Sequence, residues 1–236
     1  MREIKKKIAE ILMSTEETFP TEPTTENEMI ETFDEYEFEE IYTDIYVSIR
    51  NMEDFYGDDS RPKAALLLES FLLESMVLLK KDPEVIVVES GDYFLKSTSF
   101  TPDGEGVLHA FENVVLINSM LELYNLALTE LEYAHIDAGI GMVAFPKEEI
   151  SCCQGDEECT CLEQDEEDDY GIDFHNTALK LSMHANTEEI EPIVVNDMAY
   201  EMLQEVDQPF FSSNLQRVSE LVEDLVVYHG NIVTEE

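Results

Sequence analysis

The chain is poor in positive charge, and this scarcity narrows the partners that it can have. It carries 13 Lys and Arg against 55 Asp and Glu, which gives a formal net charge of -42 at pH 7. A surface of this charge repels nucleic acid and anionic membranes, and it repels nucleotides unless cations mediate the contact. We therefore expect no nucleic-acid partner and no membrane partner. Solubility, for example in a salt-rich cytoplasm, is the simplest reason for such a composition.

Long apolar runs are missing as well. No stretch approaches the roughly 18 apolar residues that a membrane span requires. The opening segment, "MREIKKKIAEILMSTEE", has a basic cluster but neither a long apolar run nor a small-residue cleavage site. We therefore expect no signal peptide and a cytoplasmic protein. Neither a P-loop nor a GxGxxG motif occurs, so the two commonest phosphate-binding loops are absent.

Cysteine is scarce, and all of it lies in the acidic segment "SCCQGDEECTC". The spacing lacks the paired CxxC of common zinc sites, and the segment contains no histidine. An acidic loop with incidental thiols is the favoured interpretation. A zinc or soft-metal site and a redox switch are the alternatives. The residues concerned are Cys152, Cys153, Cys159 and Cys161.

The hydrophobic pattern predicts one α+β domain behind an N-terminal arm. Residues 1–36 comprise a short amphipathic helix, at 2–13, and an acidic extended arm. Residues 37–236 form the domain, which contains an acidic Cys-containing loop at 148–169. With 44% hydrophobic residues, the chain can bury a sizeable core.

Within the domain, strands and helices alternate around a central hairpin. The expected order is β-α-β-β-α-β-α-β-α, which indicates a mixed or antiparallel sheet and excludes a doubly wound fold. The predicted segments are a strand at 41–50, a helix from Pro62, a hairpin at 85–100, a helix at 107–131, a strand at 134–146, a helix at 172–186, a strand at 190–197, a helix at 197–205, and a tail with a helix and a final strand.

Two aspartates stand out against this background. The strand "IYTDIYVSIR" alternates apolar and polar faces, yet Asp44 lies at its centre, where an unpaired carboxylate is costly. Asp92 follows Ser90 and Gly91 at the hairpin. Because the first strand and the hairpin are expected to be neighbours, the two carboxylates could face each other and hold Mg²⁺ or Mn²⁺ between them. The alternative role of Asp92 is to support the Ser-Gly-Asp turn.

Four short motifs complete the pattern: "TDI" at 43–45, "SGD" at 90–92, "GIG" at 139–141 and "NTALK" at 176–180. The two glycines of "GIG" lie inside a predicted strand, which suggests the close approach of a backbone or a ligand. In this order, over residues 38–205, the motifs resemble those of the class III nucleotide cyclases. The resemblance implies a ferredoxin-like core with flanking helices and a head-to-tail homodimer with two sites at its interface.

The resemblance also implies a reaction, in which the ribose 3′-hydroxyl of a nucleoside triphosphate attacks the α-phosphate and pyrophosphate leaves. Two Mg²⁺ or Mn²⁺ ions per site would be held by Asp44, Asp92 and the carbonyl of Ile45. From the other subunit, Asn176 would orient the ribose, and Lys180 would meet the charge that develops at the α-phosphate. The two residues are four apart and share a helix face.

Departures from the family pattern bear on the base. Lys180 stands where the family usually has Arg. The positive charge is kept, but a lysine cannot form the two parallel hydrogen bonds to a phosphate that an arginine forms. Val88 stands where purine-specific members have a Lys, and it cannot hydrogen-bond a purine edge. In those members the Lys acts together with an acidic residue or Thr that precedes the Asn, and Asp169 or Asp173 matches that residue here. We therefore expect a pyrimidine, UTP or CTP.

Within the family, the bacterial antiphage pyrimidine (Pycsar) cyclases are the most similar. Ser48 matches the serine of their first strand, and Arg50 lies near the position of their arginine. The substrate-binding candidates are Ser48, Arg50, Val88 and Asp173. The implied product is cUMP or cCMP, acting on a separate effector in antiphage defence. A purine cyclase and a catalytically inactive nucleotide-binding or regulatory protein are the alternatives.

Overall fold

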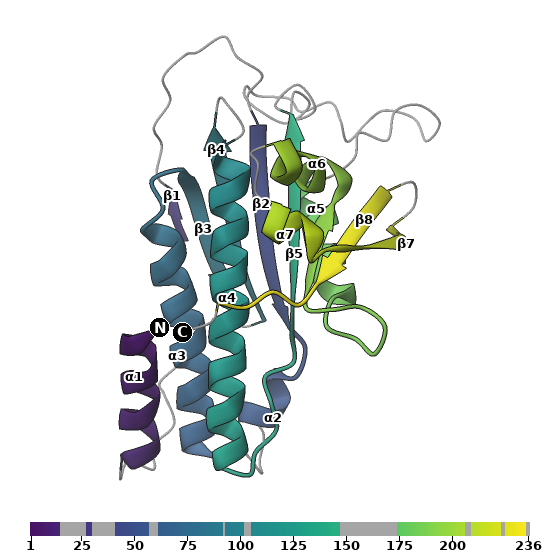
Figure 1. Cartoon of the computed structure of the whole chain (residues 1–236). Coiled ribbons are helices and arrows are strands. Elements are labelled where there is room, and N and C mark those ends of the chain that lie inside the picture. Colours follow the sequence, from purple (N-terminus) through teal and green to yellow (C-terminus); the bar gives the residue numbers. More distant parts are fainter. Residues whose placement is uncertain are drawn as a thin grey trace, which may run out of the picture.

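A single eight-stranded sheet organises the computed structural model, with strand order β1-β3-β4-β2-β5-β6-β8-β7 (Figure 1). The structure describes residues 1–14, 27–29, 41–56, 61–91, 93–101, 105–146, 174–205, 209–222 and 225–234. Its strands are β1 (Asn27–Met29), β2 (Ile41–Ile49), β3 (Val85–Gly91), β4 (Phe94–Thr101), β5 (Ala138–Pro146), β6 (Ile193–Asn196), β7 (Gln216–Val222) and β8 (Leu225–Gly230). β5 and β6 run parallel, and every other pairing between the described strands is antiparallel.

The helices close both faces of this sheet. They are α1 (Arg2–Met13), α2 (Met52–Tyr56), α3 (Pro62–Lys80), α4 (Glu105–Glu130), α5 (Phe174–His184), α6 (Asp197–Glu205) and α7 (Pro209–Ser213). The largest buried cluster joins α3 and α4 to one face of β2, β4 and β5. A smaller cluster joins α5 to the other face. Among the described helices, none combines the length and the apolarity of a membrane span.

The predicted α+β class and its ferredoxin-like core are confirmed. The segment from β2 to β5 has the order β2-α2-α3-β3-β4-α4-β5, and its strands lie in the sheet as β3-β4-β2-β5. Pro62 begins α3, as expected of proline in the first helical turn. β2 is a central strand, and its residues are buried on both faces along nearly the whole length. The side chains of β2 are therefore held in fixed positions.

The N-terminal helix packs as its periodicity predicts. Ile8 is buried, and Ile4, Ile11 and Leu12 pack against the main core. Two lysines fasten the helix to α3: Lys7 Nζ lies 2.5 Å from a Glu74 carboxylate oxygen, and Lys63 Nζ donates to the carbonyl of Leu12 at 2.6 Å. α1 is thus part of the folded domain.

Two segments differ from expectation. The acidic arm contributes the short strand β1, which pairs with β3 and extends the sheet by one strand. In the tail, the expected helix is instead the strand β7, which forms a hairpin with β8 through the pair Val218 and Val227. The tail's apolar spacing suits a helix, but its valines also suit a pleated strand, and pairing with β8 decides the outcome. The predicted loop at 148–169, with all four cysteines, lies outside the described residues.

Candidate functional site

Helix α5 lies directly on the backbone of β5, and two glycines make this possible. A Cβ atom built on Gly139 would lie 2.2 Å from the Ser182 carbonyl oxygen, and one on Gly141 would lie 2.2 Å from the Ala178 carbonyl oxygen. Both distances are far inside contact range, so any other residue at these positions would displace the helix. The expectation that another backbone approaches these glycines is confirmed.

Asn176 and Lys180 lie on the outward side of this helix. Both side chains are exposed, whereas Ala178, Leu181 and Ala185 are buried against the sheet. Lys180 forms no hydrogen bond or ion pair with another residue that the structure describes. The predicted pair of an amide and an ammonium group on one helix face is therefore present, on a helix whose position is set by backbone contact.

Ser48 is a structural residue that connects β2 to α5. Its side chain is buried, and its Oγ lies 2.5 Å from Ser182 Oγ. Ser182 donates its own proton to the Leu179 carbonyl at 2.7 Å, so Ser48 is the donor in the serine pair. This chain of hydrogen bonds uses the donor of Ser48 inside the protein, which does not fit the predicted contact to substrate.

Arg50 is likewise engaged, at the C-terminal end of α5. Its guanidinium forms an ion pair with Asp137 and donates to the carbonyls of Ala185, at 2.9 Å, and Asn186, at 3.1 Å. Longer contacts reach the carbonyls of residues 182 and 183. A cation here satisfies the unpaired carbonyls of the last helical turn and opposes the helix dipole. The predicted contact of Arg50 with substrate finds no support in this geometry, because the guanidinium donors are already used to hold α5.

Asp44 lies in the interior of the sheet, with its side chain wholly buried. Thr98 of β4, directly opposite in the register, donates a 2.6 Å hydrogen bond to its Oδ1. The neighbouring Ile45 turns its side chain into the main core, and its backbone lies between Ser97 and Met142. In that position the Ile45 carbonyl belongs to the hydrogen-bond ladder of a central strand.

The strand register separates Asp44 from the end of the hairpin. Gly91, the last described residue before Asp92, pairs with Phe94, and Phe94 pairs with Ser48. Asp44 is four residues back along β2, which is about 13 Å at the usual rise of a strand. Oxygens that share one ion lie within roughly 4–5 Å of each other. The predicted neighbourhood of β2 and the hairpin is confirmed, but the residues at the hairpin end face Ser48 rather than Asp44.

The remaining site candidates are one buried residue and two that lie outside the described chain. Val88 is 3% exposed and belongs to the cluster beneath α3 and α4. A side chain buried in this way has no surface to offer a base, and the predicted contact of Val88 with substrate finds no support here. Asp92 and Asp173 lie outside the described residues.

Sequence reasoning missed Thr98 and Ser182, the two hydroxyls that contact Asp44 and Ser48. Ser182 had a detectable signal: Ala178, Ser182 and Ala185 form a stripe of small residues at helical spacing, as a helix laid on glycines requires. Thr98 had none, because a strand's pattern shows which face a residue occupies but not which residue lies opposite.

An aromatic surface flanks Asp44 on the face that carries α5. Tyr46 stacks on Phe94 at 5.2 Å between ring centroids, and Tyr42 lies 5.0 Å from Phe100. Burial, reinforced by the charge of Glu89, raises the pKa of the Tyr46 phenol. The group is thus neutral and able to donate or accept a hydrogen bond.

Comparisons with known proteins support the fold. No protein-family profile matches the chain, and no curated protein matches it in sequence. Solved structures do match: the guanylyl cyclase Cya2 has a TM-score of 0.53 at 14% identity, over 83% of this chain and 93% of that one. The adenylyl cyclase CyaB from P. aeruginosa has a TM-score of 0.53 at 12% identity, over 84% and 95%.

A third match carries a ligand. The guanylate cyclase domain of RhGC from Catenaria anguillulae, in complex with GTP, has a TM-score of 0.52 at 17% identity, over 84% of this chain and 98% of that one. Likeness at these identities shows the fold. The chain therefore has the α+β fold of adenylyl and guanylyl cyclase catalytic domains.

Proposed function

We propose that this chain binds a nucleoside triphosphate between two copies of itself, in the manner of the cyclase domains whose fold it shares. One observation carries the proposal: Asn176 and Lys180 stand exposed on the outward face of α5, and α5 is fixed to the sheet by the glycine contacts. In a chain of net charge -42, an exposed lysine with no described acidic partner provides a place for a phosphate.

The two side chains suit different parts of the ligand. The Asn176 amide can both donate and accept, which fits ribose hydroxyls. The Lys180 ammonium is a compact charge with three donors, which fits the triphosphate. Because they lie four residues apart on one helix, a single ligand can contact both. A homodimer would place this face of α5 against the partner subunit.

We further propose that the base is a pyrimidine. The lysine that contacts the purine edge in the family's purine-specific members corresponds to Val88, and Val88 is in the core. Val88 itself cannot supply the hydrogen bond that recognises a purine edge. UTP and CTP are thus the expected ligands.

The predicted two-metal centre does not fit the residues that the structure describes. The Asp44 side chain is wholly buried and already accepts a hydrogen bond from Thr98. It also lies about 13 Å along the strand from the hairpin end. The Ile45 carbonyl belongs to the sheet. We therefore favour nucleotide binding with a regulatory or sensing role over cyclisation through Asp44.

An active pyrimidine cyclase is the second candidate. The retained Asn176 and Lys180, together with the Gly91-Asp92 sequence at the hairpin, favour it. Its product would be cUMP or cCMP, passed to a separate effector in antiphage defence. A purine cyclase differs from it in base alone.

One experiment separates these candidates. The purified chain is titrated calorimetrically with UTP, CTP, ATP and GTP, each with Mn²⁺, and the mixtures are then read by mass spectrometry. We expect a pyrimidine nucleotide to bind and no cyclic product to form. Lys180→Met should weaken binding by about 10- to 100-fold, the value of a lost charge-assisted hydrogen bond.

The control is Lys81→Met, which removes an exposed lysine at the end of α3, far from α5 in the chain. It should leave the affinity unchanged. A cyclic product that is lost in a folded Asp44→Asn variant would instead establish the cyclase and overturn our assignment. Failure of all four nucleotides to bind, in low and in high salt, would refute nucleotide binding altogether.

A further inference from the structure

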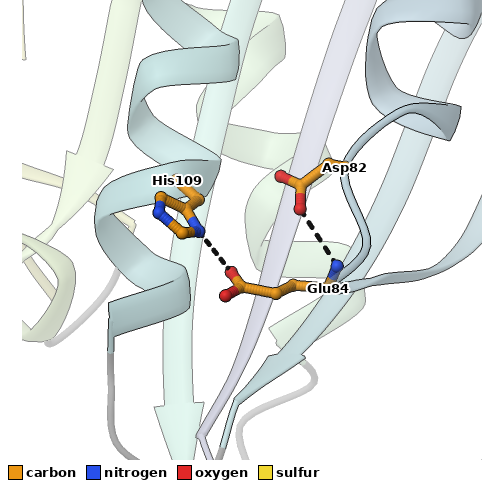
Figure 2. Close-up of side chains that lie close together, drawn as sticks. All are labelled: Asp82, Glu84 and His109. Carbon is orange, nitrogen blue, oxygen red and sulfur yellow. Dashed lines mark hydrogen bonds and ion pairs between the residues drawn. The ribbon is translucent and has the colours of Figure 1, made fainter.

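We propose that Asp82, Glu84 and His109 form a binding site for one divalent transition-metal ion, separate from the candidate nucleotide site. One ligand atom of each residue lies within 4.8 Å of those of the other two. Figure 2 shows the three side chains converging where the segment between α3 and β3 meets the first turns of α4. This is the face of the sheet that α3 and α4 cover, opposite to α5.

The backbone holds the two carboxylates in place. Asp82 follows the C-cap of α3, and its Oδ1 accepts from the Glu84 backbone N–H at 3.0 Å. Its Oδ2 accepts from the side-chain amide of Asn113 at 2.6 Å. The Glu84 carbonyl accepts from the backbone N–H of Phe100 at 3.0 Å, which ties the segment to β4. The two carboxylates are thus held close together before any ion arrives, and Asn113 orients Asp82 as outer hydrogen bonds orient metal ligands.

The distances between ligand atoms suit an ion of transition-metal size. His109 Nδ1 lies 2.9 Å from Glu84 Oε2. Neighbouring ligands of an ion with bonds of about 2.0–2.1 Å lie roughly 2.9–3.4 Å apart in octahedral or tetrahedral geometry. The edge between imidazole and carboxylate is therefore already of the required length. A small movement of Asp82 toward this edge would complete three positions around one ion.

The imidazole distinguishes this group from the acidic surface around it. Exposed carboxylates are abundant in a chain with 55 Asp and Glu, and alone they indicate no site. Among the residues that the structure describes, this is the one group of three His, Cys, Asp or Glu side chains that converges so closely. A nitrogen ligand beside two carboxylates favours Zn²⁺, Mn²⁺ or Co²⁺ over the oxygen-seeking Mg²⁺ and Ca²⁺.

The test uses the full chain, stripped with a chelator and titrated separately with Zn²⁺, Co²⁺ and Mg²⁺ at high ionic strength, where diffuse binding to the acidic surface is screened. Calorimetry gives the stoichiometry, and the visible absorption of Co²⁺ reports the coordination geometry of the bound ion. We expect one equivalent of Zn²⁺ or Co²⁺ to bind with higher affinity than Mg²⁺. His109→Gln should weaken Zn²⁺ binding by at least about tenfold and change the Co²⁺ spectrum.

Glu84→Gln and Glu112→Gln form a matched pair. Each removes one negative charge near His109, but Glu112 is an exposed residue of α4 that is not part of the group. Only Glu84→Gln should weaken Zn²⁺ binding, whereas an equal loss in both variants would indicate general attraction and overturn the site. Binding of several equivalents with no difference among the variants would overturn it too. Circular dichroism confirms folding, and Asp82→Asn provides a further ligand variant should His109→Gln fail to fold.

Discussion

The carboxylate of Asp44 and the hydroxyl of Thr98 face each other across β2 and β4 and form a 2.6 Å hydrogen bond in the closed interior of the sheet. An aspartate in the middle of a central strand is expensive unless it is satisfied, and Thr98 provides one of the donors that make it tolerable. Asp44 therefore has a clear structural role.

Removing that donor should destabilise the fold. Thr98→Val keeps the shape of the side chain but leaves a buried carboxylate with one hydrogen bond fewer, which costs about 1–3 kcal/mol. Urea unfolding at pH 7 measures the change. Thr98→Ser keeps the hydroxyl and serves as the control, with a smaller expected loss. Equal stability of wild type and Thr98→Val would show that the bond contributes nothing.

Substitution of Gly141 should lift α5 from the sheet. In Gly141→Ala the new methyl group would meet the Ala178 carbonyl at 2.2 Å and the Ser182 backbone nitrogen at 2.7 Å. Overpacking of this kind typically costs about 1–3 kcal/mol. Chemical denaturation measures the loss of stability, and calorimetric titration tests whether nucleotide affinity falls with it. Met142→Leu, the adjacent residue on the opposite face, is the volume-conserving control. A Gly141→Ala protein with unchanged stability and affinity would contradict the contact.

Arg50 should matter for stability more than for binding. Arg50→Met leaves Asp137 and the last carbonyls of α5 without their donor, and we expect a loss of about 1–3 kcal/mol. Arg50→Lys should recover only part of this loss, because an ammonium cannot reproduce the planar fork of donors. Thermal or urea unfolding measures both variants. Reduced nucleotide affinity in a fully stable Arg50→Met protein would return Arg50 to the substrate site.

The buried phenol of Tyr124 should make stability depend on alkaline pH. Burial raises its pKa to about 12, and the hydrogen bond with Ser70 acts in the opposite direction. The unfolded phenol titrates near pH 10, so the folded protein holds this proton more tightly. Its contribution is complete below about pH 10 and is lost as the pH rises toward 12.

Over that interval the free energy of unfolding should fall by up to about 1.4 kcal/mol per pH unit because of this group. Other tyrosines add their own titrations, so the comparison is with Tyr124→Phe. Denaturant unfolding of both proteins between pH 8 and 12 isolates the effect. Parallel pH profiles would mean that Tyr124 titrates normally.

Sequence reasoning anticipated the elements of the domain better than the partners of its polar residues. The alternation in "IYTDIYVSIR" predicted a strand, and Gly139 with Gly141 predicted a close backbone approach; both are confirmed. Periodicity carries such information because it depends on neighbours along the chain. The offset between two strands depends on which residues pair, and a single strand does not encode it.

The same limit applies to the candidate site residues. Asp44 and the hairpin were correctly predicted to share neighbouring strands, but the register places Ser48 at the hairpin end. Arg50 resembled an available cation because its acceptors, at the end of α5, are more than a hundred residues away in the chain. Long-range satisfaction of a polar group becomes visible only in the folded chain.

The contact of α5 with the backbone of Gly139 and Gly141 affects which residues of the outward face of α5 can be substituted. The distance between helix and sheet is set by main-chain atoms, so the outward residues of α5 contribute little to holding it in place. Lys180 and the exposed Met183 can therefore be exchanged with little penalty to the fold. Ligand preference on this face is separable from stability, and a library randomised at these two positions should consist mostly of folded proteins that differ in what they bind.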